Sequence, residues 1–162
     1  MTAETYDDLN IEDIAQLGAL LARQLHPGDT LLLAGEIGAG KSFLARSMIQ
    51  SRMAQFGAIE DVPSPTFTLV QTYLVGQEEI WHADLYRLDD PAEIEELGLL
   101  AAFDSAICLI EWPEVLGQNT PKDALSMTLT VTSDTRRSLT LEAARPKWDA
   151  LRANIKKLFT II

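Results

Sequence analysis

The octapeptide Gly-Glu-Ile-Gly-Ala-Gly-Lys-Ser at residues 35–42 constrains the fold of this chain more than any other stretch. It has the spacing of the phosphate-binding loop, in which two glycines enclose four variable residues and lysine and a hydroxyl residue follow. An apolar run at residues 31–34 precedes the octapeptide, and a helical pattern follows it. We therefore expect a buried strand, a glycine-rich turn and a helix, in that order.

Each residue type in this loop suits one task in holding phosphate. Glycines let the backbone curl until consecutive N–H groups point at one anion, and the following helix directs its positive end to the same point. Lys41 brings a positive charge to the outer phosphates, and the hydroxyl of Ser42 is placed to bind Mg²⁺. The alternative is a glycine-rich turn with an exposed lysine, but the flanking strand and helix patterns favour a nucleotide phosphate site.

The composition limits the kind of protein and the kind of partner. With 162 residues we expect one domain, residues 1–162. The formal net charge of -11 argues against stable binding of nucleic acid by this chain alone, because such proteins usually present a basic face. The single cysteine, Cys108, lies in an apolar run and is expected to be a buried structural thiol in a reducing cytoplasm.

Neither a membrane span nor a signal peptide is predicted. No apolar run approaches the ~18 residues that a membrane-spanning helix needs, and the acidic N-terminal residues do not resemble a signal peptide.

N-cap residues and prolines mark the helices. Asn10 and Asp90 are suitable N-caps, so we expect a helix directly after each of them. A further helix is expected over residues 41–55, and another opens at Pro146.

Periodicity marks the strands. Alternating apolar and β-branched residues predict two hairpins, formed by residues 66–75 with 80–88 and by residues 125–132 with 138–143. A wholly apolar run at residues 107–110 predicts a strand that is covered on both faces. We expect residues 1–8 to form an edge segment or a loose arm, and residues 58–65 to form a loop.

Two acidic residues are candidates for binding the metal that accompanies a nucleotide. Glu111 directly follows the apolar strand, which places it at a carboxyl end, where open α/β sheets bind their ligands. Asp84 lies among apolar and aromatic neighbours in residues 82–88. Phosphate-loop enzymes hold Mg²⁺ with such an acid, directly or through water. The alternatives are a solvated acid at a strand end for Glu111, and an ion pair with Arg87 for Asp84.

Three residues near these acids carry less specific signals. Thr66 ends a rigid Ser-Pro-Thr turn and suits a nucleotide-sensing loop and a strand cap equally well. His82 is either a general base or, as is commoner, a hydrogen-bonded structural histidine. Trp112 either stacks near the nucleotide or fills the core. The guanine-binding pattern N-K-x-D is absent, so adenine is favoured.

Four motifs occur together in the order and spacing of one known family. They are the loop at residues 35–42, Ser-Pro-Thr-Phe-Thr-Leu-Val at 64–70, His-Ala-Asp-Leu-Tyr-Arg-Leu at 82–88 and Ile-Glu-Trp-Pro-Glu at 110–114. In these motifs the chain resembles the bacterial TsaE (YjeE) proteins over about residues 11–136. Those proteins are small P-loop ATPases needed to make threonylcarbamoyladenosine in tRNA.

The resemblance implies an α/β fold: a P-loop NTPase-like, mostly parallel sheet with antiparallel hairpin additions, flanked by helices. It implies weak hydrolysis of ATP with Mg²⁺, stimulated by partner proteins. It also implies action on the TsaD–TsaB complex to allow multiple turnovers, with tRNA contacted only indirectly through that complex.

Matching the motifs residue by residue implies individual roles. Lys41 would hold the β- and γ-phosphates, and Ser42 and Glu111 would serve Mg²⁺. Asp84 would assist the metal or position water, and Thr66 would lie on a switch-like loop beside the reacting phosphate. The other nucleotide contacts would come from Ile11, Gly35, Glu36, Ile37, Gly38, Ala39, Gly40, Phe43, Trp112 and Arg136.

Two other functions use the same loop. A small-molecule kinase would need an acceptor pocket and usually a cluster of arginines on a lid. Arg136 and Arg137 are the only candidates for such a cluster in the sequence. A nucleotide-binding module that does not hydrolyse ATP would work through ATP occupancy alone.

Overall fold

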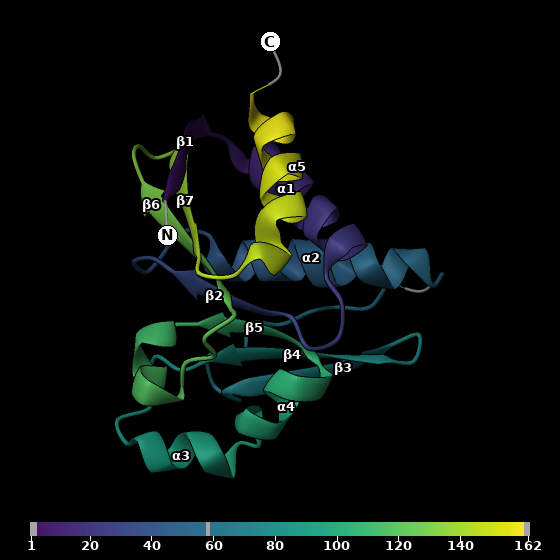
Figure 1. Cartoon of the computed structure of the whole chain (residues 1–162), viewed down its shortest axis with the longest axis vertical. Coiled ribbons are helices and arrows are strands. Elements are labelled where there is room, and N and C mark those ends of the chain that lie inside the picture. The colour runs from purple at the N-terminus through teal and green to yellow at the C-terminus, as the bar shows by residue number, and fades with distance from the viewer. Residues whose placement is uncertain (1–2, 58, 161–162) are drawn as a thin grey trace.

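The computed structural model describes residues 3–57 and 59–160. The first two residues of the predicted N-terminal segment and the first residue of the predicted loop at 58–65 lie outside this range. In the described part, helices cover both faces of a seven-stranded sheet (Figure 1). None of the described helices has the length and apolar character needed to cross a membrane.

The sheet is parallel in its middle and antiparallel at its margins. Its strands are β1 (Glu4–Leu9), β2 (Thr30–Ala34), β3 (Val70–Val75), β4 (Glu78–Asp84), β5 (Ile107–Glu111), β6 (Leu125–Val131) and β7 (Arg137–Ala143). Their order across the sheet is β1-β7-β6-β2-β5-β4-β3. Strands β6, β2, β5 and β4 run parallel to one another, whereas β7, β1 and β3 each pair antiparallel with their neighbours. The expected sheet with antiparallel hairpin additions is therefore confirmed.

The α-helices follow the predicted caps, with one addition. They are α1 (Ile11–Gln24), α2 (Lys41–Gln55), α3 (Pro91–Glu96), α4 (Leu99–Ser105) and α5 (Asp149–Phe159), with 3-10 helices η1 (Pro113–Asn119) and η2 (Pro146–Trp148). Asn10 and Asp13 form a capping box at the start of α1, and the side chain of Asp90 caps α3. The short helix α4 was not predicted.

Two apolar cores lie on opposite faces of the sheet. Helices α1, α2 and α5 cover one face, and α3, α4 and η1 cover the other (Figure 1). Gly18 lets α1 and α2 approach closely, because a Cβ atom at this position would lie 2.6 Å from the Cβ of Ser47. Cys108 is fully buried in the second core, and burial raises the pKa of its thiol to about 12, as expected for a structural cysteine.

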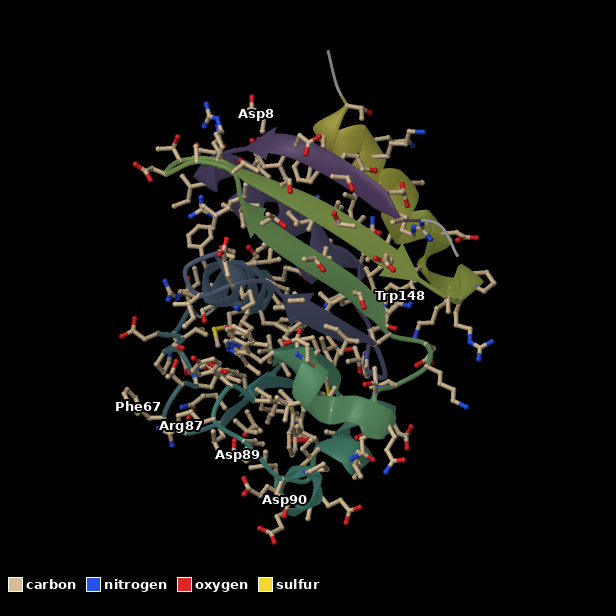
Figure 2. The ribbon with its side chains drawn as sticks, turned by 90° about the vertical axis from the view of Figure 1, so that its left-hand side faces the viewer. Asp8, Phe67, Arg87, Asp89, Asp90 and Trp148 are labelled. Atoms are coloured by element: carbon tan, nitrogen blue, oxygen red, sulfur yellow. The ribbon has the colours of Figure 1, made fainter. Side chains whose placement is uncertain are left out.

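The C-terminal helix is fixed to the sheet at its start. Trp148 lies directly before α5 (Figure 2) and is 2% exposed. Its indole N–H donates a hydrogen bond of 2.6 Å to the carbonyl of Asp123, just before β6. Strand β1 occupies the sheet edge beside β7, so the predicted edge segment is correct and the loose arm is not.

Two predicted strand boundaries are wrong. The strand predicted over residues 66–75 begins only at Val70, because residues 65–69 form a turn closed by a 2.7 Å bond from Leu69 N–H to Pro65 O. Leu69 has a φ of 69°, which lies outside the extended region typical of strand residues. The strand predicted over residues 80–88 ends at Asp84, because the chain turns so that Leu88 N–H bonds to Leu85 O.

Candidate functional site

The glycine-rich loop joins β2 to α2 and has the backbone that its sequence requires. Gly35, Gly38 and Gly40 all have positive φ angles. At Gly35 a Cβ atom would lie 2.4 Å from the carbonyl oxygen of Leu129, so no other residue fits. Gly40 lies directly before α2. The first N–H groups of this helix have no partner within the helix and point towards the space enclosed by the loop.

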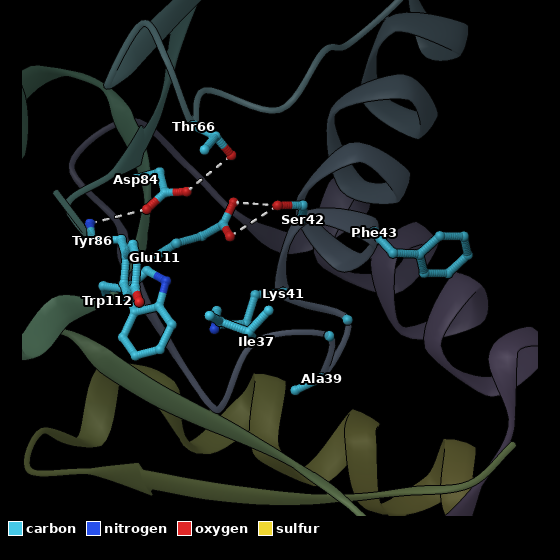
Figure 3. Close-up of a pocket in the computed structure, with 12 residues that line it drawn as sticks. Ile37, Ala39, Lys41, Ser42, Phe43, Thr66, Asp84, Tyr86, Glu111 and Trp112 are labelled. Carbon is cyan, nitrogen blue, oxygen red and sulfur yellow. Dashed lines mark hydrogen bonds between the residues drawn. The ribbon is translucent and has the colours of Figure 1, made fainter. Parts of the chain in front are cut away.

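A cavity of about 380 Å³ opens above the loop (Figure 3). Its walls are Ile37, Gly38, Ala39, Gly40, Lys41, Ser42, Phe43, Thr66, Asp84, Tyr86, Glu111 and Trp112. Every one of these except Tyr86 was among the predicted site residues. Gly35 and Glu36 belong to the same loop but do not line this cavity.

Lys41 is held inside the loop by backbone carbonyls. Its ammonium group donates to the carbonyl oxygens of Gly35 and Glu36, and it lies 3.9 Å from the centre of the Trp112 ring. The side chain is buried, and the resulting loss of hydration lowers its pKa, although the negative charge of Glu111 opposes this shift. The position is one at which an anion in the cavity would stabilise the charged form.

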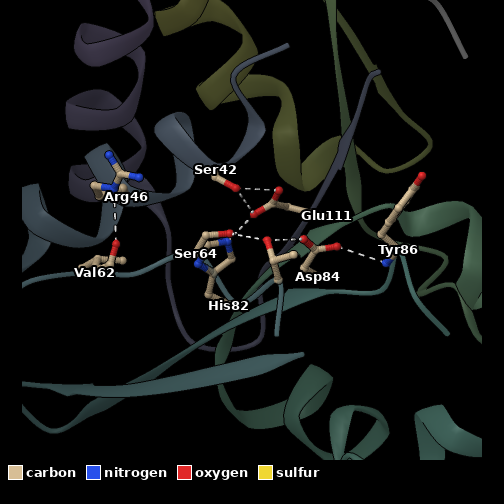
Figure 4. A network of polar contacts seen from close by, with 9 residues as sticks. Ser42, Arg46, Val62, Ser64, His82, Asp84, Tyr86 and Glu111 are labelled. Atoms are coloured by element: carbon tan, nitrogen blue, oxygen red, sulfur yellow. Dashed lines mark hydrogen bonds and ion pairs between the residues drawn. The ribbon is translucent and has the colours of Figure 1, made fainter. Parts of the chain in front are cut away.

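Ser42 and Glu111 meet at the back of the cavity. The hydroxyl of Ser42 lies 2.9 Å from both carboxylate oxygens of Glu111. The Oε2 atom of Glu111 also accepts a 2.6 Å hydrogen bond from Nε2 of His82 (Figure 4). Glu111 is thus buried at the end of β5, and the predicted alternative of a solvated acid is wrong.

Asp84 lies next to Glu111 because β4 and β5 are parallel and pair these two residues in register. One oxygen of Asp84 accepts from the Tyr86 N–H at 3.0 Å, and the other lies 3.4 Å from the hydroxyl of Thr66. Arg87, the predicted alternative partner of Asp84, instead lies 5.7 Å above the ring of Phe67. Thr66 belongs to a turn and not to a strand, which removes the strand cap as its explanation.

The donors gathered here suit a small, hard cation. Ser42, Asp84 and Glu111 present hydroxyl and carboxylate oxygens, which Mg²⁺ prefers. Within residues 3–57 and 59–160 no group of three His, Cys, Asp or Glu side chains forms a complete metal cage. Mg²⁺ at nucleotide sites commonly takes one or two protein ligands and completes its shell with phosphate and water, so the set fits this ion.

Trp112 begins the segment after β5 with an unusual backbone. Its φ of 58° turns the ring over Lys41, and Tyr86 packs against the ring with centroids 4.7 Å apart. The same indole also contacts the core beneath α4 and η1. Of the two alternatives predicted for Trp112, core packing is therefore confirmed, whereas stacking near the nucleotide stays a prediction.

A second cavity of about 530 Å³ adjoins the first and shares Ala39, Gly40 and Phe43 with it. It lies between the start of α1 and the turn that joins β6 to β7. The predicted residues Ile11 and Arg136 both line it. Ile11 is 64% exposed, and Arg136 forms a 3.1 Å ion pair with the exposed Asp8.

The sequence analysis did not predict that Arg137 contacts the phosphate loop. Its Nε atom donates to the carbonyl of Ala39 at 3.0 Å, and a terminal nitrogen donates to that of Gly38 at 3.2 Å. It also bonds to the carbonyl of Ser133 in its own turn. Arg137 therefore ties the phosphate loop to the β6–β7 turn, and the pair of adjacent arginines was the only sequence signal for it.

Comparison with known proteins gives a consistent picture. The family model described as "Threonylcarbamoyl adenosine biosynthesis protein TsaE" matches residues 9–139. The chain is 39% identical over 128 residues to the tRNA threonylcarbamoyladenosine biosynthesis protein TsaE of Rickettsia felis, covering 79% of this chain and 73% of the relative. It is 31% identical over 144 residues to the protein of the same name from Bacillus subtilis, covering 88% and 87%.

The fold is also that of a solved structure. The crystal structure of Bacillus subtilis YdiB superimposes with a TM-score of 0.74 at 23% sequence identity, over 96% of this chain and 95% of that one.

Proposed function

The chain belongs to the TsaE family of tRNA threonylcarbamoyladenosine biosynthesis proteins, and from this premise we propose that it binds and hydrolyses ATP in that pathway. The observation that carries the proposal is the cavity above the phosphate loop. There, a lysine, a helix N-terminus, a hydroxyl and two buried carboxylates converge on one space. Phosphate-loop enzymes use this combination for phosphoryl transfer.

The protein groups would divide the work between binding and chemistry. The loop N–H groups and Lys41 would hold the phosphates, and Ser42 and Glu111 would hold Mg²⁺, which neutralises phosphate charge when bound. Asp84 lies beside Thr66 at the cavity wall and would orient the attacking water. The water oxygen would bond to the γ-phosphorus while the bond to the bridging oxygen breaks, and the protons of the water would leave with the inorganic phosphate or pass to solvent, giving ADP and phosphate.

The second cavity would receive the nucleoside. It adjoins the loop at Ala39 and Gly40, and its wall includes the apolar side chains of Ile11 and Phe43. Apolar walls suit a purine ring, and the absence of a guanine motif favours adenine.

Hydrolysis would act on a protein complex and not on tRNA directly. We propose that the partners are the TsaD–TsaB pair and that ATP turnover allows that pair to complete repeated rounds of modification in the cytoplasm. The net charge of -11 supports a protein partner, since a chain that held tRNA by itself would need a basic face.

The kinase alternative is weakened by the arrangement of the two adjacent arginines. The guanidinium of Arg137 donates hydrogen bonds to carbonyls of the phosphate loop, and that of Arg136 forms an ion pair with Asp8. Neither is placed on a lid above the cavity. The other alternative, a module that binds ATP without hydrolysing it, is distinguished by measuring phosphate release.

The proposal is tested by measuring phosphate release from ATP by the purified chain, alone and with the TsaD–TsaB pair. We expect slow release that rises with the pair and is lost in Lys41→Ala. Lys156→Ala, on the exposed side of α5, is the matched control and should behave as the unmodified chain. Binding of ATP without release under either condition would contradict the proposal and favour a kinase or a binding module.

A further inference from the structure

His82 is the one buried histidine of the described chain and lies directly behind the candidate metal ligands. It is 1% exposed, on β4, two residues before Asp84. Alternate residues of a strand lie on the same face of the sheet, so His82 and Asp84 share a face. The parallel pairing of β4 with β5 brings this face next to Glu111.

The hydrogen bond between His82 and Glu111 has a fixed direction. A carboxylate offers acceptors only, so Nε2 of His82 must carry a hydrogen and donate it to Oε2 at 2.6 Å. In the described part of the chain Nδ1 is buried with no hydrogen-bond partner. Glu111 is therefore the only hydrogen-bond partner of the His82 ring among the described residues.

The other support of Glu111 cannot fix its carboxylate alone. Ser42 lies 2.9 Å from both oxygens, but its hydroxyl has a single hydrogen and can donate to only one of them at a time. The bond from His82 adds a second donor, which is directed at Oε2. Two donors from two different elements then hold the plane of the carboxylate.

We propose that His82 is a positioning residue that sets the orientation of Glu111 towards the metal and the phosphates, an inference that rests on the proposed function of the site. Its contribution to packing does not explain a histidine here. An aliphatic side chain would fill the same space without leaving a ring nitrogen buried and unpartnered, which costs folding free energy. What a histidine adds at this position is the donor at Nε2.

Three variants separate the donor from the packing. His82→Gln places an amide N–H near the position of Nε2, His82→Asn places it near that of Nδ1, and His82→Leu has no donor. We expect phosphate release with the partner pair to fall by about 10- to 100-fold in the Leu and Asn variants, as is usual when the group that orients a metal ligand is lost. His82→Gln should recover to within about threefold of the unmodified chain, because hydrogen-bond geometry determines the effect.

A second measurement does not depend on turnover. Calorimetry of ADP binding with and without Mg²⁺ gives the gain in affinity that the metal provides. This gain should shrink in His82→Leu and His82→Asn and persist in His82→Gln, whereas affinity without metal should stay unchanged in all three. His26→Gln, which changes an exposed histidine, is the control and should alter neither quantity.

The positioning role of His82 and the hydrolysis of ATP would be contradicted by different results. An unchanged turnover and an unchanged metal gain in His82→Leu would overturn the positioning role. Equal losses in the Gln and Leu variants would overturn it as well, since packing would then account for the effect. ADP binding with a normal metal gain but no phosphate release in the unmodified chain would contradict ATP hydrolysis, while the metal gains of the variants would still test His82.

Discussion

The two adjoining cavities share a loop but are built in opposite ways. In the phosphate cavity Lys41, Asp84 and Glu111 are each no more than 6% exposed, and each has fixed hydrogen-bond partners. In the second cavity Ile11 is 64% exposed, and the side chain of Arg136 forms an ion pair with the exposed Asp8. Buried charges act strongly at short range, whereas exposed ones are screened by water.

The difference follows from the position of each cavity on the sheet. The phosphate cavity lies at the carboxyl ends of β2, β5 and β4, in the parallel middle of the sheet (Figure 1). There each strand is hydrogen-bonded to a neighbour on both sides, which holds its end in place. The second cavity lies between the N-terminus of α1 and a turn at the antiparallel margin. We infer that the first provides affinity and chemistry, and that the second mainly selects the base.

The strongest test of this division is Lys41→Ala. The change removes the only cation that lines the phosphate cavity in the described chain. We expect the Kd for MgADP to rise by about 100-fold, since hydrogen bonds to charged groups contribute about 1.5–3 kcal/mol each and the lysine can make more than one. Calorimetry measures the change, with Lys156→Ala as the control. An unchanged Kd would contradict the phosphate site.

Glu111→Ala should separate chemistry from binding. Nucleotide binding without metal should persist, because the loop and Lys41 remain, whereas Mg²⁺-dependent turnover should fall by about 100-fold. Phosphate release with the partner pair gives the turnover, and Glu142→Ala on the exposed side of β7 is the control. Normal turnover would remove Glu111 from the site.

Arg137→Gln probes the connection between the two cavities. The change deletes the bonds to the carbonyls of Gly38 and Ala39, so the loop should lose part of its fixed shape. We expect roughly tenfold weaker MgADP binding, equivalent to about 1.4 kcal/mol. Arg145→Gln, at an exposed position after β7, should have no effect. Equal affinity in both variants would show that the loop keeps its shape without Arg137.

The smallest effect is expected from Ile11→Ala in the second cavity. Removing part of an exposed apolar wall should weaken ADP binding by roughly two- to fivefold, in line with about 25 cal/mol per Å² of apolar contact. Pyrophosphate binding should not change, because it uses the other cavity. A competition assay with ADP and pyrophosphate checks this. An equal loss of affinity for both ligands would contradict the assignment of phosphate and nucleoside to different cavities.

The phosphate side of the site could be predicted from the sequence because its geometry depends on local chemistry. The loop spacing determines the backbone, and a single register between β4 and β5 brings Asp84 next to Glu111. The start of β3 could not be predicted, because the alternation at residues 66–69 is that of a strand while Leu69 has a positive φ. Helix α4 was missed, since seven residues give too short a pattern.

Contacts across long stretches of sequence escaped prediction for a different reason. Arg137 reaches a loop 98 residues away, and nothing in its local sequence distinguishes it from Arg136. Arg136, which was predicted, lines the second cavity, but Arg137 makes the hydrogen bonds to the phosphate loop. Likewise, a histidine in a strand is usually structural, and only the position of β5 reveals that His82 faces Glu111.

A single set of calorimetric titrations tests the central claim most directly. The unmodified chain is titrated in turn with MgADP, MgGDP and adenosine. If the phosphate cavity provides most of the affinity, adenosine will bind at least about 100-fold more weakly than MgADP, and MgGDP will fall between the two. Adenosine affinity within about tenfold of MgADP would contradict the account, because the nucleoside cavity would then provide most of the binding free energy.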